Sequence, residues 1–497
     1  MTRIRWALST AAFAAHFAVA SRYDFFRDEL YFIACGRHPS FGYADQPPLV
    51  PLIAAATQMF GEHLWLLRAV AALAAFGAVW FTCKIAELVE AGAVGIVLAG
   101  VAAATAPMFL AVTTTLNTSS FEPLLWTALV YFIARAVVLE DTRGWIWAGL
   151  LAGIDLESKY ELPLRLLPLL VALVLAGRGR ALLRREALFG AVIAAILAAP
   201  SAIWQLGHGL PFLELMRAGA SGKNTVVPAG AFLLQQAMAM NPLYALLALA
   251  GVAAPIADPR FRQWRFVALG FALTVALVMA LHGKDYYLAP AYGPVMALGA
   301  AAVDRWIRPA WVKVTLLVPA LAVSAVAAPV VMPILAPPRL AAYMQMIHLA
   351  PKSGENLDQS EIPQTFADMM NWRALAQDVA AAVRSLPPED QKRVVILGRN
   401  YGESGALDFF GPALGMPPVI GRHNQYWYWG TRGYDGALMI WVNYTPERIK
   451  DKCTEVTLLG RSNAPYAMPY ERNVPITLCR GLRRPLSEEW AELKLII

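Results

Sequence analysis

The sequence predicts a polytopic α-helical membrane protein with about eleven spans, followed by a soluble α/β domain. Apolar residues make up 58% of the chain and charged residues only 15%, which is too little charge for a soluble globular protein. Uncharged runs that exceed the roughly 20 residues needed to cross a bilayer recur over the first two thirds of the chain. After residue 338 these runs stop, and polar residues become frequent.

The expected spans fall into long uncharged runs and shorter runs with charged ends. The long runs are residues 91–121, 187–207, 224–257 and 314–338, and the shorter runs are residues 6–21, 69–83, 266–281 and 286–303. The first run follows Arg3 and Arg5, as in a signal peptide, but no small-residue cleavage site precedes the next polar loop. We therefore expect an uncleaved first helix.

The basic residues indicate how the spans are oriented. The formal net charge is +7, but Lys and Arg lie mainly at the ends of the spans, so no nucleic-acid partner is predicted. If the spans alternate, these residues fall on one side of the membrane, which the positive-inside rule assigns to the cytoplasm. The opposite side, facing the periplasm or the exterior, then holds residues 23–64, 113–120, 207–227, 282–287 and everything after residue 338.

Two domains follow from this pattern. Residues 1–338 are expected to form the transmembrane domain of a multi-pass protein of the cytoplasmic (inner) membrane, and residues 339–497 an extracytoplasmic α/β domain. Strand-like runs at residues 393–397, 437–442 and 454–459, with helical spacing over residues 374–386, predict the second domain. In that domain, Cys453 and Cys479 either form a disulfide or are two buried thiols. The turn at residues 398–405 lacks the G-x-G-x-x-G spacing, so we expect no nucleotide there.

The first outer loop, residues 23–64, carries the most informative residues. Asp28 and Glu29 follow the first span, and Asp45 precedes Pro47 and Pro48. A carboxylate near lipid is costly unless it is used or paired, so Asp28 or Glu29 is a candidate general base for an acceptor hydroxyl. The alternative is a solvated helix start, where the helix dipole favours acids. The prolines keep the chain ahead of them extended, which is expected to fix Asp45 near the membrane surface.

A third acid on the outer side, Glu122, opens a long apolar run. Asp28, Asp45 and Glu122 come from separate segments and carry the oxygen ligands that hard divalent cations prefer. We treat these three acids as a candidate metal site. Alternatively, the acids divide into a base and supporting carboxylates, or Glu122 is only the N-terminal acid of a helix. Apart from a divalent cation, no cofactor is predicted.

Two basic elements are candidates for binding a phosphate. The charged turn at residues 155–161 joins two arms that are too short to cross the bilayer independently. Lys159 in this turn is therefore a candidate for binding an anionic lipid headgroup, with an ordinary interfacial turn as the alternative. Lys284 can neutralise a phosphate that Tyr286 or Tyr287 hydrogen-bonds. The alternative for these three residues is an aromatic belt at the membrane interface.

Together these pieces resemble the family 39 glycosyltransferases of the GT-C fold, which include the protein O-mannosyltransferases and the bacterial aminoarabinose transferase. The resemblance lies within residues 1–330 and rests on Asp28-Glu29, Asp45 to Pro48, Glu122, Ser158 to Tyr160, and Lys284 to Pro290. Gln46 stands where the members that modify lipid A commonly carry Lys. The C-terminal domain has no counterpart to which the resemblance assigns a function.

The resemblance implies a membrane glycosyltransferase that uses a polyprenyl-phosphate-linked sugar donor and a lipid, glycan or protein acceptor. Asp28 or Glu29 would deprotonate the acceptor hydroxyl, and Asp45 and Glu122 would position a cation or a water. The residues implied in binding the substrates are Asp45, Lys159, Tyr160, Arg217, Lys284, Tyr286 and Tyr287, of which the cations would stabilise the departing phosphate. A transporter or flippase of lipid-linked sugars is the alternative; it predicts acids on both sides of the membrane, whereas these acids cluster on the outer side.

Overall fold

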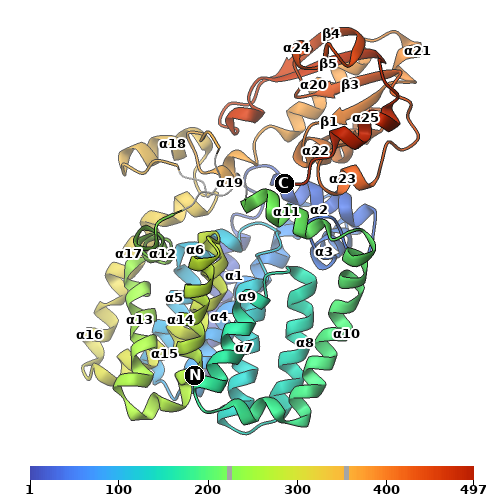
Figure 1. Cartoon of the computed structure of the whole chain (residues 1–497). Helices are drawn as coiled ribbons and strands as arrows, with labels where there is room; N and C mark the ends of the chain where they lie inside the picture. The colour runs from blue at the N-terminus through green and yellow to red at the C-terminus, as the bar shows by residue number, and fades with distance from the viewer. Residues whose placement is uncertain (221–226, 352–356) are drawn as a thin grey trace. The chain divides into compact units, whose positions relative to one another are not determined.

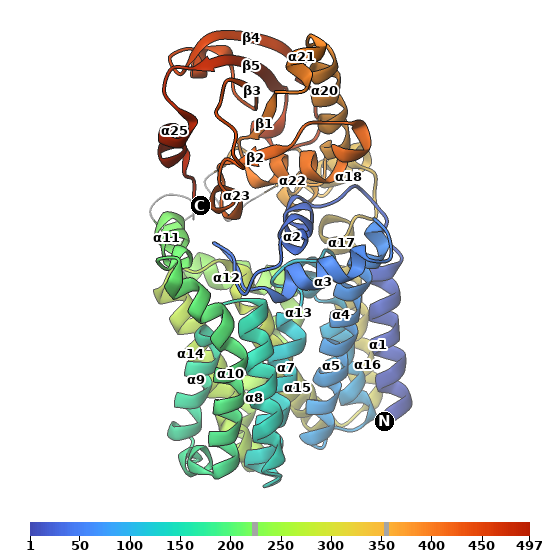
Figure 2. The same ribbon diagram turned by 90° about the vertical axis from the view of Figure 1, so that its right-hand side faces the viewer.

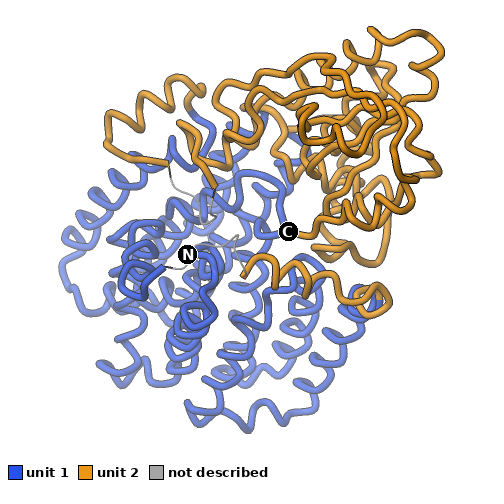
Figure 3. The backbone as a smooth tube through the Cα atoms, turned by 45° about the horizontal axis from the view of Figure 1, so that its top comes forward, with its two compact units in different colours: residues 1–21, 65–203, 226–334 blue, residues 22–64, 204–225, 335–497 orange. Residues whose placement is uncertain are grey.

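The computed structural model describes residues 1–220, 227–351 and 357–497. The chain divides into two compact units, shown in different colours in Figure 3. The helical unit comprises residues 1–21, 65–203 and 226–334, and the α/β unit comprises residues 22–64, 204–225 and 335–497. The domain boundary predicted at residue 338 thus lies close to residues 334–335, where the chain passes from the helical unit to the α/β unit. The first outer loop groups with the C-terminal residues rather than with the helices that flank it in the sequence.

The helical unit consists mainly of apolar helices of different lengths, many of which lie side by side (Figure 1). Its helices are α1 (Thr2–Phe17), α4 (Leu64–Leu88), α5 (Ala93–Thr105), α6 (Pro107–Val112), α7 (Glu122–Val138), α8 (Arg143–Ser158), α9 (Pro163–Leu175), α10 (Arg185–Gly207), α12 (Ala229–Met240), α13 (Pro242–Ala257), α14 (Arg265–Ala280), α15 (Ala289–Trp306), α16 (Ala310–Thr315) and α17 (Leu317–Val331). Short 3-10 turns, η1 (Gly179–Leu183), η3 (Pro259–Trp264) and η4 (Asp285–Leu288), join some of them.

Glycines allow two of these helices to approach closely. A Cβ atom on Gly299 of α15 would lie 1.8 Å from the carbonyl oxygen of Leu247 in α13, and one on Gly251 of α13 would lie 2.0 Å from that of Val295 in α15. Only glycine fits at either position. Small residues at a helix interface are the usual means by which membrane helices pack, because lipid provides no hydrophobic driving force between them.

The number of spans that the structure supports by length is smaller than the number expected. Within the described residues, four helical segments are long and apolar enough to cross a membrane: Leu64–Leu88, Arg185–Gly207, Pro259–Ala280 and Ala310–Val331. The pair α12 and α13 counts as a fifth if it is one span bent by 110°. Helices α1, α7 and α8 have only 16 or 17 residues. The estimate of eleven spans is therefore not confirmed.

Prolines explain part of this difference. The run at residues 91–121 is divided at Pro107, which begins α6, and the run at residues 224–257 is divided at Pro242, which begins α13. Proline lacks the N–H needed inside a helix and instead favours its first position. Hydropathy alone registers these segments as continuous, whereas the helices that they form are separate.

The α/β unit contains a five-stranded mixed sheet with the strand order β2-β1-β3-β5-β4 (Figure 2). Its strands are β1 (Val395–Gly398), β2 (Val419–Gly421), β3 (Leu438–Val442), β4 (Cys453–Ser462) and β5 (Val474–Leu482). β1 is parallel to β2 and to β3, whereas β5 is antiparallel to β3 and to β4. The predicted strands at residues 393–397, 437–442 and 454–459 are confirmed as β1, β3 and β4. β2 and β5 were missed: β2 has only three residues, and β5 contains Pro475, a residue that is disfavoured inside strands.

Helices cover both faces of this sheet. The predicted helix at residues 374–386 is confirmed as α20 (Trp372–Arg384), and Figure 2 shows it on the opposite side of the sheet from α25 (Leu486–Leu493). The remaining helices of the unit are α2 (Arg27–Arg37), α3 (Leu49–Gln58), α11 (Pro211–Ala218), α18 (Pro337–Met346), α19 (Gln364–Ala367), α21 (Pro388–Gln391), α22 (Tyr401–Phe410), α23 (Gln425–Tyr428) and α24 (Pro446–Ile449). Cys453 and Cys479 form a disulfide between β4 and β5, which decides the question that their spacing left open.

Candidate active site

The acid pair of the first outer loop lies in the first turn of α2, and its two carboxylates have different environments. Glu29 has no exposed surface, and its Oε2 accepts a hydrogen bond of 2.8 Å from the backbone N–H of Phe26. This is the arrangement of a capping box, which satisfies an otherwise unpaired N–H at the helix start. Asp28 keeps 30% of its side chain exposed. Of the two acids, Asp28 is therefore the one that a substrate can reach.

Asp28 is held by two residues of the α/β unit. Tyr401, the first residue of α22, donates a hydrogen bond of 2.8 Å from its hydroxyl to Oδ1 of Asp28. The Nε of Arg27 lies 4.0 Å from the same oxygen, and the Arg27 guanidinium lies 4.5 Å from the centre of the Tyr401 ring. A hydroxyl donor and a neighbouring cation both favour the ionised carboxylate, which is the form that can accept a proton.

Both carboxylate oxygens of Asp45 are also engaged. Tyr31 donates its hydroxyl hydrogen to Oδ1 at 2.7 Å, and Asn424 donates from Nδ2 to Oδ2 at 2.9 Å. Burial raises the pKa of Asp45 to about 6, and the hydrogen bonds from Tyr31 and Asn424 oppose this rise because they stabilise the charged form. The chain before Asp45 is fixed as well, since the N–H of Ala44 donates to Oε1 of Gln425 at 2.9 Å.

The helical unit holds a second cluster of charged side chains, where the charged turn meets the start of α7. Glu122 is 1% exposed, and its Oε1 accepts a hydrogen bond of 2.5 Å from Arg165, which is fully buried. Arg165 also lies 3.9 Å from the buried carboxylate of Asp155. The Nζ of Lys159 lies 2.8 Å from Glu161 and 3.6 Å from Glu122. Each of these charges has an opposite charge within 3.9 Å, which offsets part of the cost of burying it.

Lys159 is thus surrounded mainly by oxygens of the protein itself. Its ammonium group also donates to Oγ of Ser119 at 2.8 Å, so its three donors have three protein oxygens within reach. The rings of Tyr286 and Tyr287, in η4, lie with their centres 5.0 Å from the same nitrogen. The structure therefore brings together four residues that the sequence suggested separately: Glu122, Lys159, Tyr286 and Tyr287.

The other predicted residues lie near these clusters or apart from them. Tyr160 follows Lys159 in the turn between α8 and α9, and Lys284 directly precedes η4. Arg217 is in α11 of the α/β unit and is exposed. Asp28 and Asp45 belong to the α/β unit, whereas Glu122 belongs to the helical unit. Within residues 1–220, 227–351 and 357–497, no group of three or more His, Cys, Asp or Glu residues is placed to hold a metal ion, so a shared divalent cation stays a prediction.

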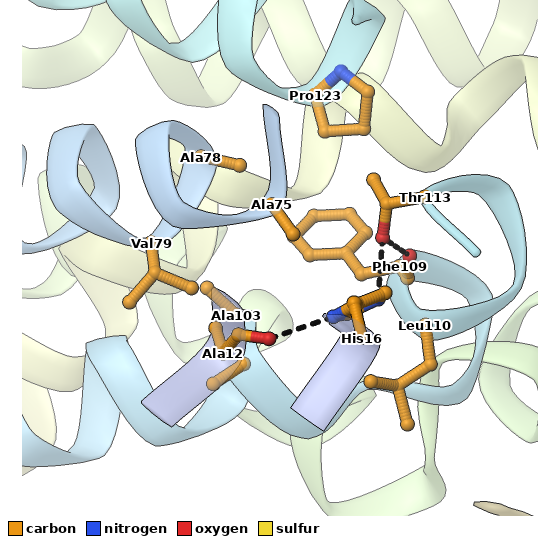
Figure 4. Close-up of a pocket in the computed structure, with 11 residues that line it drawn as sticks. Ala12, His16, Ala75, Ala78, Val79, Ala103, Phe109, Leu110, Thr113 and Pro123 are labelled. Carbon is orange, nitrogen blue, oxygen red and sulfur yellow. Dashed lines mark hydrogen bonds between the residues drawn. The ribbon is translucent and has the colours of Figure 1, made fainter. Parts of the chain in front are cut away.

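One buried histidine of the helical unit serves the packing rather than a substrate site (Figure 4). His16 of α1 uses both ring nitrogens, with Nδ1 2.8 Å from the carbonyl oxygen of Ala12 and Nε2 2.8 Å from Oγ1 of Thr113. The cavity beside it has a volume of about 10 Å³, which is room for about one water. An ionisable residue inside a membrane protein is a functional candidate by default, but here Nδ1 is bonded within α1 and Nε2 connects α1 to Thr113 at the end of α6.

Several residues of these clusters were not identified from the sequence. Arg165 had a usable signal, because an arginine in the apolar run that begins at Pro163 requires an acid nearby. Tyr31, Tyr401 and Asn424 had none. The last two are separated from their acid partners by 373 and 379 residues along the chain, and an ordinary Tyr or Asn gives no indication of such a partner.

Comparison with known proteins bears on the fold and on one segment of the chain. Residues 45–204 match the family described as dolichyl-phosphate-mannose-protein mannosyltransferase, a segment that includes Asp45, Glu122, Lys159 and Arg165. The crystal structure of ArnT from Cupriavidus metallidurans bound to undecaprenyl phosphate aligns with a TM-score of 0.59 and 14% identity, covering 96% of this chain and 97% of that chain. The chain has the GT-C fold. The resemblance inferred from the sequence is thereby confirmed.

The ArnT crystal structure in the apo state gives a similar alignment. Its TM-score is 0.62 at 14% identity, with 95% of this chain and 97% of that chain covered. The alignment includes the C-terminal α/β domain, for which the sequence suggested no relative. No match was found among curated proteins. The fold and the apolar helices support a multi-pass membrane protein, and the family match supports a glycosyltransferase.

Proposed function

We propose that the protein is a membrane glycosyltransferase that moves a sugar from a polyprenyl-phosphate-linked donor to an acceptor hydroxyl at the outer face of the cytoplasmic membrane. The observation that carries this proposal is Asp28, a partly exposed carboxylate at the start of α2 that is held by Tyr401 and Arg27. The GT-C fold, the family match over residues 45–204 and the undecaprenyl phosphate bound to ArnT support the same reaction class.

In this mechanism Asp28 is the general base. It accepts the proton of the acceptor hydroxyl as the hydroxyl oxygen forms a bond to the anomeric carbon of the sugar. The bond between that carbon and the phosphate oxygen breaks, and its electron pair leaves with the polyprenyl phosphate. Glu29 is not assigned this role because it is buried and caps α2. Asp45, in the neighbouring segment, has a supporting role beside Asp28, in which it positions a water or a divalent cation.

The developing negative charge on the phosphate requires cations. We assign this role to Lys284, beside the tyrosines of η4. Lys159 has Glu161 and Glu122 as partners, so its larger contribution is to neutralise these acids and hold the charged turn in place. Without its charge, two carboxylates close to the tyrosines would repel a phosphate.

Single substitutions of the two lysines distinguish these roles. We expect Lys284→Gln to raise the KM for the donor about tenfold or more, because a hydrogen bond to a charged group is lost. Lys159→Gln is expected to raise the donor KM and also to lower the melting temperature, because Glu161 and Glu122 lose a partner. Rates at varied donor and acceptor concentrations, with thermal unfolding of each variant, test both. Donor kinetics that stay unchanged in both variants would remove the two lysines from the phosphate site.

The decisive test of the function is sugar transfer by the purified protein in lipid nanodiscs. An undecaprenyl-phosphate donor with a labelled sugar is supplied with lipid, glycan and peptide acceptors in separate reactions. We expect label on one acceptor and an equal amount of released polyprenyl phosphate. Absence of transfer to every acceptor by folded protein would overturn the proposal. Movement of the donor across vesicles without transfer would instead support the transporter or flippase alternative.

A further inference from the structure

The carboxyl ends of the parallel strands in the α/β unit face the chain's own acidic loop. β1 and β2 are parallel and end at Gly398 and Gly421, and the residues that follow include Tyr401 and Asn424. In open α/β sheets, ligands usually bind at these carboxyl ends of the strands. Here side chains that follow the strand ends make hydrogen bonds to Asp28 and Asp45 of the first outer loop. The carboxyl ends of the strands thus hold the two acids.

The turn after β1 also helps to hold Asp28, because it fixes the position of Tyr401. The backbone N–H groups of Arg399 and Asn400, before α22, donate to Oε2 of Glu403 at 2.7 and 3.3 Å. The side chain of Asn400 in turn accepts from the N–H of Glu403 at 3.0 Å, which completes a capping box. These donors, which would attract an anion at a helix N-terminus, are therefore satisfied by the protein. The turn fixes the first residue of α22, which is Tyr401.

Ring contacts restrict Tyr401 further. The centre of its ring lies 4.8 Å from that of Tyr31, 4.8 Å from that of His423 and 4.5 Å from the guanidinium of Arg27. A ring packed on three sides cannot change rotamer without displacing its neighbours. The Tyr401 hydroxyl is consequently directed at Asp28.

Asn424 is held in a backbone conformation that side chains rarely adopt. Its φ is +50° and its ψ is −128°, and such strain persists only where the surroundings enforce it. The N–H of Asn424 donates to the carbonyl oxygen of Leu495 at 2.8 Å, and its Oδ1 accepts from the N–H of Ile497 at 3.3 Å. With these contacts fixing the residue, Nδ2 points at Asp45.

We propose that Tyr401 and Asn424 are positioning residues of the transferase, through which the C-terminal α/β domain holds Asp28 and Asp45 in the orientation that transfer requires. This inference rests on the proposed function, because it assigns a task in that reaction to a domain whose role the sequence left open. Both residues act through the acids, since each contacts a carboxylate. The acids and the two residues all belong to the α/β unit.

The first variant is Tyr401→Phe, which removes only the hydroxyl and keeps the ring contacts. We expect kcat to fall about tenfold, because a hydrogen bond to a charged group is lost, with the donor KM and the melting temperature unchanged. The matched control is Tyr444→Phe. Its hydroxyl accepts from Arg422 at 3.2 Å, and its loss is expected to leave kcat unchanged. Equal kcat values for wild type and Tyr401→Phe would overturn the role of Tyr401.

The second variant is Asn424→Gly, which removes the amide but suits the backbone, because glycine adopts positive φ without strain. The titratable groups that face Asp45 are Tyr31, Cys35 and Asp28, all on α2. The Asn424 hydrogen bond stabilises ionised Asp45, so its loss raises the pKa of Asp45. We expect a lower kcat and an acid limb of the pH–rate profile displaced to higher pH by about half a unit or more.

A readout that needs no substrate tests the contact between Asn424 and Asp45 directly, and the activity of wild type separates this inference from the proposed function. Carbodiimide modifies protonated carboxyl groups, and peptide mass spectrometry of the full-length protein between pH 4 and pH 8 follows Asp45 directly. The midpoint of its modification is expected to rise in Asn424→Gly and to stay at the wild-type value in Tyr444→Phe. If wild type transfers no sugar, the proposed function fails and the positioning role fails with it, whatever the midpoint. If wild type is active while both variants keep its kcat, pH profile and midpoint, only the positioning inference is overturned.

Discussion

Replacing Asp28 by Asn is expected to lower the rate of sugar transfer by about 10²- to 10⁴-fold, the usual contribution of a general base. The amide cannot accept the proton of the acceptor hydroxyl. The fold is expected to persist, because Glu29 still caps α2 and the Tyr401 hydroxyl can donate to the amide oxygen of the new side chain. Initial rates at saturating donor, together with the melting temperature, test the prediction.

The neighbouring variant Glu29→Gln is the matched comparison. Gln also occurs at this position of a capping box, so the helix start is expected to remain intact and turnover to stay close to that of wild type. If Asp28→Asn instead keeps normal turnover while Glu29→Gln loses it, the base is Glu29. If neither variant affects the rate, the acid pair has no catalytic role.

The second large effect is expected from Arg165→Met in the helical unit. Removing one partner of a buried ion pair costs about 3–5 kcal/mol of folding free energy, because the other charge is left buried and uncompensated. Here Glu122, 1% exposed, and Asp155, with no exposed side-chain surface, lose their guanidinium. We expect a marked fall in the melting temperature of the protein in detergent micelles. Tryptophan fluorescence during heating measures this temperature.

A double variant and a surface control complete this experiment. Glu122→Gln combined with Arg165→Met removes both charges, and is expected to be more stable than Arg165→Met alone. Arg484→Met removes an arginine whose side chain is 48% exposed, with a partner, Glu492, that is 54% exposed; solvent screens such pairs, so no measurable change is expected. If Arg165→Met melts at the temperature of the Arg484→Met control, the buried network does not stabilise the fold.

Local signals in the sequence were sufficient for several parts of the protein. The strands β1, β3 and β4 and the helix α20 follow from short-range patterns, since apolar and polar residues alternate according to the geometry of the element that they form. The turn between α8 and α9 was predicted from its charged residues, but α8 continues through Ser158, so the turn begins at Lys159 rather than at Asp155. The span count is not confirmed, because hydropathy sums over residues and does not register where a proline, such as Pro242, divides a helix.

The roles of the acids were determined by tertiary contacts. From the sequence, Asp28 and Glu29 are equivalent adjacent carboxylates; in the structure Glu29 caps its own helix, whereas Asp28 stays partly exposed and is held by Tyr401 from a distant segment. Lys159 is a plausible phosphate ligand by composition, but its oxygen partners are supplied by Ser119, Glu122 and Glu161. Which partner a charge finds depends on segments that meet only in the folded chain.

The sequence by itself determined that this chain is helical and membrane-spanning, that an α/β domain follows, and that acids gather in the loop after the first helix, at Asp28, Glu29 and Asp45. Composition, hydropathy and proline positions carry that information, because each acts on neighbouring residues. The tertiary structure alone decided that Tyr401 and Asn424 reach Asp28 and Asp45 from more than 370 residues away. No local pattern encodes such a pairing, since hydrogen-bond geometry is set by how the sheet edge and the loop pack together.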